Sequence, residues 1–396
     1  MSHTYTLTQH RNWYNIFRQW KLPLYFSKSV MSHITHFVDG MLSSGYTGTL
    51  TDIHRESLHH RDRRSLSHFL SHGKWDEQFL KQVVRNIAYQ QVKFSAKHNN
   101  SPIFVLVDDT VCEKTKPSSQ AVDSIQGSAF HHSHLKGKKV YGHAVVEAML
   151  RAGDVVYPFA TERYKSKSKS KIDLVCDMIR QVPRSHHPTY VLMDSWYPSA
   201  SVLQVSSEQG FHVISGLKTN RIIYPQGIRQ SIKEFASFIS KSDADLVTIG
   251  VDSYRVYRYE GKLNLLDNGV VLFCWKEGEE LNPKQVKAFL STDVSLTNKQ
   301  ILSYYSKRWS IETYFRAAKV HLGLDRYQVR STKAIDRYWA LLSFVSMCCI
   351  YSGQGNLLDG LHQYRREKKQ HWIEYVYKQA LSGVALAQIQ TQLRAA

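Results

Sequence analysis

The sequence predicts an α/β fold in which a central sheet is preceded and followed by helices. Between residues 99 and 217, short apolar runs alternate with segments of helical periodicity, which is typical of an α/β sheet domain. Residues 218–290 are rich in strand patterns, and the chain becomes helical again from Thr297 onward. A length of 396 residues favours two or three domains that share a substantial core.

These changes of pattern give the expected domain boundaries. We expect a helical domain at 1–98, a sheet domain formed by 99–217 and 291–355, a β-rich insertion at 218–290 and a basic helical tail at 356–396. The first boundary falls at Asn99-Asn100-Ser101-Pro102, a composition that ends a helix and starts an extended segment.

The N-terminal region predicts helices with a basic outer face. Within 76–97, apolar residues recur at helical spacing, at Phe79, Leu80, Val83, Val84, Ile87, Ala88 and Phe94. In the stretch 54–70, Leu58, Leu66, Phe69 and Leu70 could face a small core while Arg55, Arg61, Arg63 and Arg64 face outward. A compact DNA-binding unit and a solvated charged face explain this stretch equally well.

The elements of the sheet domain follow in order. We expect strands at 103–107, 140–150, 155–160, 190–193 and 211–217, and helices at 172–182 and 200–209. In the insertion, VTIGVDSYRVYRYEG and GVVLFCW are the best strand candidates. The apolar stretch 338–351 is shorter than the roughly 20 residues that a membrane span needs, so it predicts a buried helix.

The charge of the chain points to a polyanionic partner. The sequence has 52 Lys and Arg against 33 Asp and Glu, a formal net charge of +19. Without a membrane-spanning segment, nucleic acid is favoured over a membrane surface. Five scattered cysteines without a CxxC pair and an N-terminus without an apolar signal core favour a cytoplasmic protein. The absence of a GxxxxGK[ST] motif gives no support to a nucleotide cofactor.

Acidic residues follow two of the expected strands. Asp108 and Asp109 come after IFVLV, and Asp194 comes after TYVLM. A carboxylate at the carboxyl end of a buried strand lies at the rim of the sheet, where α/β proteins place ligands. Aspartate is also a common strand terminator and helix cap, so two such positions favour a functional site only modestly.

The segment 304–323 (YYSKRWSIETYFRAAKVHLG) carries the most informative pattern. On a helix turning about 100° per residue, four polar residues fall within about 60° of one face, and they are Tyr305, Arg308, Glu312 and Lys319. A neighbouring apolar stripe would dock this helix on the sheet, and it consists of Ile311, Phe315, Ala318 and Leu322. An amphipathic helix with ion pairs four residues apart is the plainer interpretation. That interpretation does not explain why the stripe of polar residues lies directly beside the apolar stripe that would be buried.

The spacing Tyr305-x2-Arg308-x3-Glu312-x6-Lys319 matches the YREK signature of a large group of bacterial insertion-sequence DDE transposases. The pattern around it, Arg308-Trp309-x-Ile311-Glu312, matches as well, and Asp108-Asp109-Thr110 resembles the D-x-T motif of the first catalytic aspartate. Asp194 resembles the second catalytic aspartate, and SLSHFLSHGKWD (65–76) resembles the helical DNA-binding region. The resemblance spans roughly residues 30–350.

This resemblance implies a ribonuclease H-like mixed sheet flanked by helices, with a β-rich insertion and an N-terminal helical DNA-binding domain. It implies that Asp108, Asp194 and Glu312 are catalytic and hold two Mg²⁺ ions, for which Mn²⁺ could substitute. Strand alternation sends Asp108 and Asp109 to opposite faces, so only one should be the first catalytic carboxylate; Asp108 fits better.

Several cationic and aromatic residues are candidates for DNA contacts. Tyr305, Arg308 and Lys319 would position the scissile phosphate, and Trp309 could either stack on a base or belong to the core. Lys218 and Arg221, just past a strand, could reach DNA or form a polar turn. Basic clusters could also face DNA: His131, His132, His134 and His143 with Lys136, Lys138 and Lys139, and separately Lys165, Lys167, Lys169 and Lys171. A zinc site at the histidines is a weaker alternative because their spacing is irregular.

The expected function is that of a cut-and-paste DNA transposase. It would bind the terminal inverted repeats of its element and the target as double-stranded DNA, as a homodimer, in the bacterial cytoplasm and close to the nucleoid. Two alternatives remain open: a ribonuclease H-like nuclease without strand transfer, and a transposase-derived DNA-binding protein that has lost catalysis.

Overall fold

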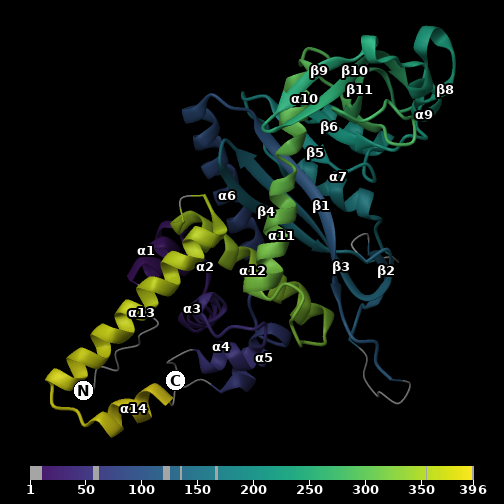
Figure 1. Cartoon of the computed structure of the whole chain (residues 1–396). Helices are drawn as coiled ribbons and strands as arrows, with labels where there is room; N and C mark the ends of the chain where they lie inside the picture. The colour runs from purple at the N-terminus through teal and green to yellow at the C-terminus, as the bar shows by residue number, and fades with distance from the viewer. Residues whose placement is uncertain are drawn as a thin grey trace.

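The computed structural model describes residues 11–56, 62–118, 125–133, 136–165, 168–353 and 355–394 (Figure 1). A mixed sheet runs through the molecule. The N-terminal and C-terminal helices lie together at one end of this sheet, and the β-rich segment lies at the other (Figure 1).

The N-terminal region is helical throughout its described part, as predicted. Its helices are α1 (Arg11–Gln19), α2 (Leu22–Tyr25), α3 (Lys28–Leu42), α4 (Leu50–Arg55), α5 (Arg63–Ser71) and α6 (Glu77–Asn99). Side chains that accept a backbone amide begin four of them, because the first amides of a helix lack partners within it; these caps are Ser27, Thr49, Asp62 and Asp76. Asn100, with φ 45°, ends α6 in the left-handed conformation.

The predicted basic outer face is present in α5. Leu66, Phe69 and Leu70 are buried, whereas Arg63 and Arg64 are exposed. Leu58 and Arg61 lie outside the described residues. Phe94 was expected on the apolar face of α6, and that expectation is wrong, since the side chain is 72% exposed. The buried face of this last part of α6 is formed by smaller residues, and the Phe94 ring stacks on His98 instead.

Arg337 fixes the N-terminal helices to the rest of the molecule. It lies on α12 (Thr332–Ser352), is buried, and donates to the Glu77 carboxylate at 3.0 Å. Its other hydrogen bonds go to the backbone carbonyls of Phe69, Leu70, Gly73 and Trp75. Because α6 also packs on strands β3 (Lys138–Ala152) and β4 (Val155–Arg163), the N-terminal helices and the sheet share one core.

The sheet has the strand order β2-β3-β1-β5-β6-β12-β11-β10-β7-β8, with β4 on β3 and β9 on β10. The strands that surround the candidate site are β1 (Ile103–Glu113), β2 (Ala129–Ser133), β5 (Thr189–Met193) and β6 (His212–Leu217). β1 pairs antiparallel with β3 and parallel with β5, which in turn pairs parallel with β6. This is the mixed sheet that the sequence predicts.

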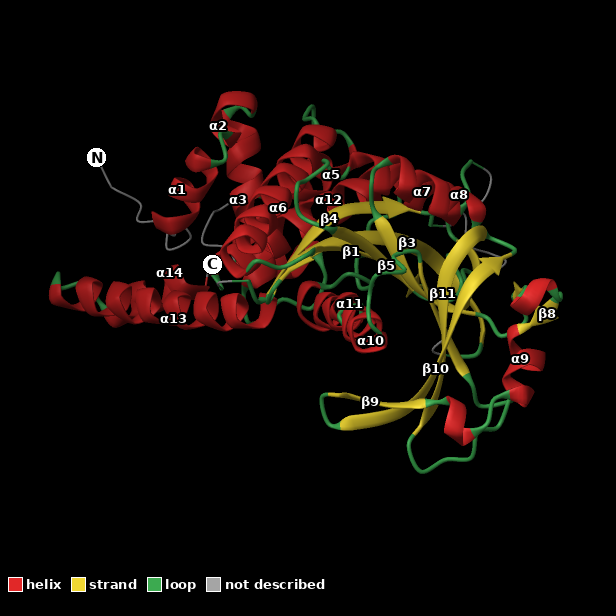
Figure 2. Ribbon diagram, turned by 90° about the horizontal axis from the view of Figure 1, so that it is seen from above, coloured by secondary structure: helices red, strands yellow, loops and turns green. Residues whose placement is uncertain are grey.

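Helices cover both faces of the sheet. Figure 2 shows α7 (Lys171–Gln181) and α8 (Ala200–Glu208) on one side, and α10 (Asn298–Ser306) and α11 (Trp309–Leu322) on the other. Residues 103–107 are fully enclosed between these layers, which explains why their sequence is uniformly apolar.

The predicted insertion is rich in strands, and its strands continue the same sheet. They are β7 (Ile222–Ile223), β8 (Gln230–Ser231), β9 (Asp245–Ile249), β10 (Asp252–Leu263), β11 (Leu266–Lys276) and β12 (Lys287–Ser291), with the short α9 (Ile232–Phe235) after β8. Both strand candidates of the sequence fall on β9, β10 and β11. β12 pairs with β6 and with β11, so it joins the insertion to the strand that follows Asp194.

The C-terminal part is helical, as predicted, and ends in α13 (Leu357–Leu381) and α14 (Leu386–Arg394). The apolar stretch 338–351 lies in α12, and nearly all of its side chains are buried. In the part of the chain that the structure describes, no single helix is long and apolar enough to cross a membrane. Only α12 and α13 taken together pass by length and composition, and they meet at 82°.

Candidate active site

Asp108 and Asp194 lie level with each other on neighbouring strands. β1 and β5 pair in parallel up to Leu106 and Leu192, so Asp108 and Asp194 stand two residues beyond the last pair on each strand. The sequence placed Asp108 after the end of its strand; this is wrong, because β1 continues to Glu113 through its pairing with β3. Both aspartates nevertheless lie at the edge of the parallel part of the sheet, because β5, the parallel partner of β1, ends at Met193.

Burial governs the protonation of Asp108. The pKa of this carboxyl is raised to about 7, chiefly by loss of solvent; the Arg308 guanidinium opposes the shift, and the nearby Asp194 carboxylate adds to it. Asp194 Oδ1 accepts a hydrogen bond from the Trp196 amide at 2.9 Å. Near neutral pH, Asp108 is therefore poised between its acidic and ionised forms.

The helix that carries the YREK pattern is interrupted. A single helix over 304–323 was expected, but α10 ends at Ser306 and α11 begins at Trp309. At the junction the amide of Arg308 bonds to the Tyr305 carbonyl and that of Ile311 to the Arg308 carbonyl, a three-residue spacing that tightens the turn. Side chains three residues apart eclipse in such a turn, so the Arg308 guanidinium lies 5.7 Å from the Tyr305 ring centroid.

Arg308 bridges two of the three predicted catalytic acids. Its Nη1 donates to Asp108 Oδ2 at 3.0 Å, and its Nη2 donates to Glu312 Oε1. The three side chains are only 13%, 17% and 31% exposed for Arg308, Asp108 and Glu312. The structure thus brings β1 and α11 together around one guanidinium, and Asp194 after β5 is close enough to act on the charge of Asp108. The predicted apolar stripe of α11 is buried as expected, at Ile311, Phe315, Ala318 and Leu322.

Tyr305 and Lys319 also face this rim. A Cβ atom on Gly216 would stand 3.2 Å from the Tyr305 hydroxyl and 3.2 Å from the Ser195 amide, so glycine allows the tyrosine to approach the end of β6. Burial raises the pKa of Tyr305 above its usual value. Lys319 Nζ donates to Thr110 Oγ1 at 2.7 Å and to the Val111 carbonyl at 3.1 Å, so this predicted DNA contact is anchored on β1.

Asp109 faces the opposite side of the strand, as the alternation of β1 predicts. Its Oδ1 accepts a hydrogen bond from the Tyr197 hydroxyl at 2.6 Å, and its Oδ2 pairs with Lys171 Nζ at 2.5 Å. Sequence reasoning missed the role of Tyr197 altogether. The only available signal was its position three residues after Asp194, which places it in the turn that leaves the strand.

The remaining predicted DNA contacts lie away from the acids. Lys218 is exposed just after β6, and Arg221 Nη2 donates to the Pro198 carbonyl at 2.8 Å. Trp309 is 55% exposed, so the interpretation of a core tryptophan is wrong, and base stacking by this side chain stays a prediction. It lines a cavity of about 520 Å³ together with Arg151 and Lys307.

Two residues of the predicted histidine cluster, His131 and His143, are buried. His143 is buried, with Nδ1 2.7 Å from the Tyr327 hydroxyl and Nε2 2.9 Å from the Gln126 carbonyl oxygen. His132 is exposed on the β2–β3 hairpin, while His134 lies outside the described residues. Both nitrogens of His143 are therefore engaged in hydrogen bonds, one with Tyr327 in the segment before α12 and one with Gln126 in the segment before β2.

The acids suit a divalent cation in type. In the described part of the chain, no three His, Cys, Asp or Glu side chains gather closely enough to hold a metal ion, because the Arg308 guanidinium lies between Asp108 and Glu312. Three carboxylates are nevertheless the hard oxygen ligands that Mg²⁺ and Mn²⁺ prefer. The positive charge of Arg308 balances Asp108 and Glu312, as a bound cation would.

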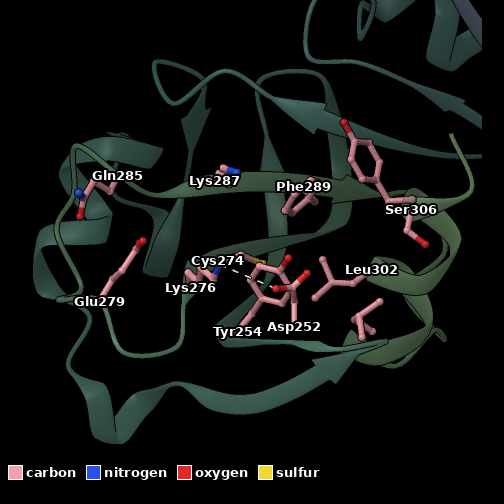
Figure 3. A pocket seen from close by; sticks show the side chains of 12 residues that line it. Asp252, Tyr254, Cys274, Lys276, Glu279, Gln285, Lys287, Phe289, Leu302 and Ser306 are labelled. Carbon is pink, nitrogen blue, oxygen red and sulfur yellow. Dashed lines mark ion pairs between the residues drawn. The ribbon is translucent and has the colours of Figure 1, made fainter. Parts of the chain in front are cut away.

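A cavity of about 590 Å³ adjoins the site on the side of the insertion (Figure 3). Tyr305 and Ser306 form one end of its lining, and the Tyr305 ring packs on Phe289 with centroids 4.7 Å apart. Lys276 enters it paired with Asp252 at 3.8 Å (Figure 3). Sequence reasoning missed this cavity, although the two-residue alternation of β10 and β11 could have indicated a shared inner face.

Comparison with known proteins identifies a family model that matches the part of the chain that contains most of the sheet. The family model described as "Transposase DDE domain" matches residues 99–348, which is more than half of the chain. The match covers β1, the turn after β5, the insertion and all of α11. No curated protein matches the chain.

Proposed function

The chain belongs to the transposase family that is defined by the DDE domain, and on that premise we propose that it binds the ends of its own mobile element and moves that element by a cut-and-paste mechanism. The observation that carries the proposal is that Asp108 and Glu312 meet at Arg308, while Asp194 follows β5 beside Asp108 and acts on its charge. Cleavage by water would precede attack of a 3′-hydroxyl on target DNA.

Asp108, Asp194 and Glu312 are proposed to hold two Mg²⁺ ions, with Mn²⁺ as a substitute. Members of this family generally use divalent metal ions. Such ions assist an in-line displacement at phosphorus by activating the attacking oxygen and stabilising the leaving one. For the chain itself, the pKa of about 7 at Asp108 means that this carboxyl must lose a proton before it can act as a ligand near neutral pH.

Arg308 is proposed to hold the scissile strand. A phosphodiester offers a guanidinium the same pair of oxygen acceptors that Asp108 and Glu312 offer in the absence of DNA. Tyr305 lies against Arg308 and would add a hydroxyl beside the same phosphate. Lys319 would contribute its charge from the anchored position on β1.

The basic surface would bind the element ends and the target as double-stranded DNA. A net charge of +19 offsets the repulsion between the phosphate backbone and a site built from three carboxylates. Because two ends must be brought together, we propose that the active form is a homodimer on DNA. The helical N-terminal domain, residues 1–98, is the proposed end-binding region, and Arg63 and Arg64 are exposed on its helix α5.

Two other functions fit the same family membership. A nuclease would cut without joining, and a transposase-derived DNA-binding protein would neither cut nor join. The ion pairing of the partly buried Asp108 and Glu312 with Arg308 favours retained chemistry over loss of catalysis, because these two carboxylates would be costly to keep enclosed without a role.

A supercoiled plasmid that carries the gene with its flanking DNA separates the three functions. In the presence of Mg²⁺, insertion products indicate a transposase, nicks alone indicate a nuclease, and retarded intact DNA indicates a binder. Asp194→Asn and Glu312→Gln should each abolish cleavage while leaving DNA binding within about twofold. Asp267→Asn, at a fully exposed position of the insertion, is the matched control. Cleavage at the wild-type rate by either site variant would remove the assigned acids from the mechanism.

A further inference from the structure

The second aspartate of the Asp108-Asp109 pair is the centre of a buried network that joins three segments. Its Oδ1 accepts the Tyr197 hydroxyl at 2.6 Å, and its Oδ2 accepts Lys171 Nζ at 2.5 Å. Tyr197 belongs to the turn after β5, and Lys171 is the first residue of α7. Asp109 thereby connects β1, the turn that contains Asp194 and the start of a helix.

Tyr197 and Lys171 both depend on Asp109 as their hydrogen-bond acceptor. The Tyr197 side chain is fully buried, so loss of its acceptor would leave a hydroxyl without a partner in the protein interior. Lys171 is only 17% exposed and stands in the first turn of α7, where the helix dipole disfavours a cation. The Asp109 carboxylate compensates that charge, and the Trp196 ring lies 5.5 Å from the ammonium group.

The network lies where the backbone no longer holds the two strands together. The β1–β5 ladder ends at Leu106 and Leu192, two residues before Asp108 and Asp194. The two acids repel each other when both are ionised. The Tyr197–Asp109 bond ties the turn after Asp194 to the residue next to Asp108, so it replaces the missing ladder at the point where the repulsion acts.

We propose that Asp109 and Tyr197 are positioning residues that set the separation between Asp108 and Asp194, and that Lys171 holds Asp109 in place for this purpose. The inference rests on the proposed function for the role of Asp108 and Asp194. It assigns Asp109 a place outside the catalytic set, because strand alternation directs its side chain to the face of β1 opposite Asp108, where it contacts Tyr197 and Lys171.

The first experiment measures cleavage of the plasmid as a function of Mn²⁺ concentration. In Asp109→Asn, the amide oxygen can still accept the Tyr197 hydroxyl, so cleavage should persist with a Mn²⁺ requirement raised a few-fold. Tyr197→Phe should raise the requirement about tenfold and leave the rate at saturating Mn²⁺ within about threefold. Tyr377→Phe, on the exposed face of α13, is the control. Complete loss of cleavage in Asp109→Asn, as in Asp108→Asn, would make Asp109 a catalytic ligand and overturn the proposal.

The second experiment measures hydrogen exchange in the full-length protein without DNA or metal. The peptide that contains residues 192–198 should exchange at least several-fold faster in Tyr197→Phe than in wild type, while peptides from α13 stay unchanged. Unchanged exchange in this peptide would overturn the positioning role. If the wild-type protein cuts no DNA, the proposed function fails, and the exchange result still decides whether the network fixes the turn.

Discussion

Removal of the Arg308 guanidinium should make the DNA-free protein a better binder of divalent cations. In wild type, a cation must displace Arg308 from Asp108 and Glu312 before it can reach both carboxylates. Hydrogen bonds to charged groups contribute about 1.5–3 kcal/mol each. Much of this is regained when the guanidinium is hydrated, so a net difference of about 1.5 kcal/mol remains, which is roughly a tenfold change in affinity.

The assay is a titration of the DNA-free protein with Mn²⁺ at pH 8, followed by the loss of the free-ion electron paramagnetic resonance signal. In wild type most of Asp108 is ionised at this pH, because its pKa is about 7; loss of Arg308 raises that pKa, so the titration is repeated at pH 9. Arg308→Ala should lower the dissociation constant about tenfold, and Arg308→Lys should give an intermediate value, since a lysine cannot bridge both acids. Arg316→Ala removes the same charge from an exposed position on α11 and is the matched control. Unchanged or weaker Mn²⁺ binding by Arg308→Ala would refute the reasoning.

Three further outcomes follow from the structure. The pKa of Asp108 is raised from 3.8 to about 7 in the folded protein, so the free energy of unfolding should fall as pH rises from about 4 through 7, by at most about 4 kcal/mol. Asp108→Asn should remove this dependence, as measured by urea titrations at pH 5 and pH 8. Arg337→Ala should lower the free energy of unfolding by about 3–5 kcal/mol, because it leaves buried carbonyls and Glu77 without their donor; Lys333→Ala on the same helix should change it little. Gly216→Ala should reduce cleavage without weakening DNA binding, because the added methyl group pushes Tyr305 away from the end of β6; equal cleavage in both proteins would argue against this contact.

The YREK spacing predicted a polar face shared by four residues, and the contacts of Arg308 with Glu312 and Tyr305 confirm it for three of them. The spacing could not predict the break between α10 and α11. Three-residue and four-residue hydrogen bonds both keep Tyr305, Arg308 and Glu312 on adjacent positions, so the periodicity is compatible with either. The break is set by packing, which a pattern of residue types does not record.

The extent of β1 shows a second limit of the sequence. The apolar run IFVLV ends at Val107, and the strand was expected to end there, but pairing with β3 carries it to Glu113. Loss of apolar character marks the end of full burial and of the pairing with β5, not the end of the strand. The network of Asp109, Tyr197 and Lys171 depends on contacts between distant segments, for which one sequence carries no pattern.

The pairing of β12 with β6 has a consequence for the length of the insertion. Leu217 and Ala288 are direct partners in the sheet, so the chain leaves and returns at neighbouring positions. Topologically, everything between them is one long hairpin loop. The entropy of closing such a loop grows only with the logarithm of its length, about 0.6 kcal/mol for each doubling. The closure entropy of the insertion therefore depends little on its length, whereas β11, which pairs with β12, supplies ladder and core contacts that a replacement would have to retain.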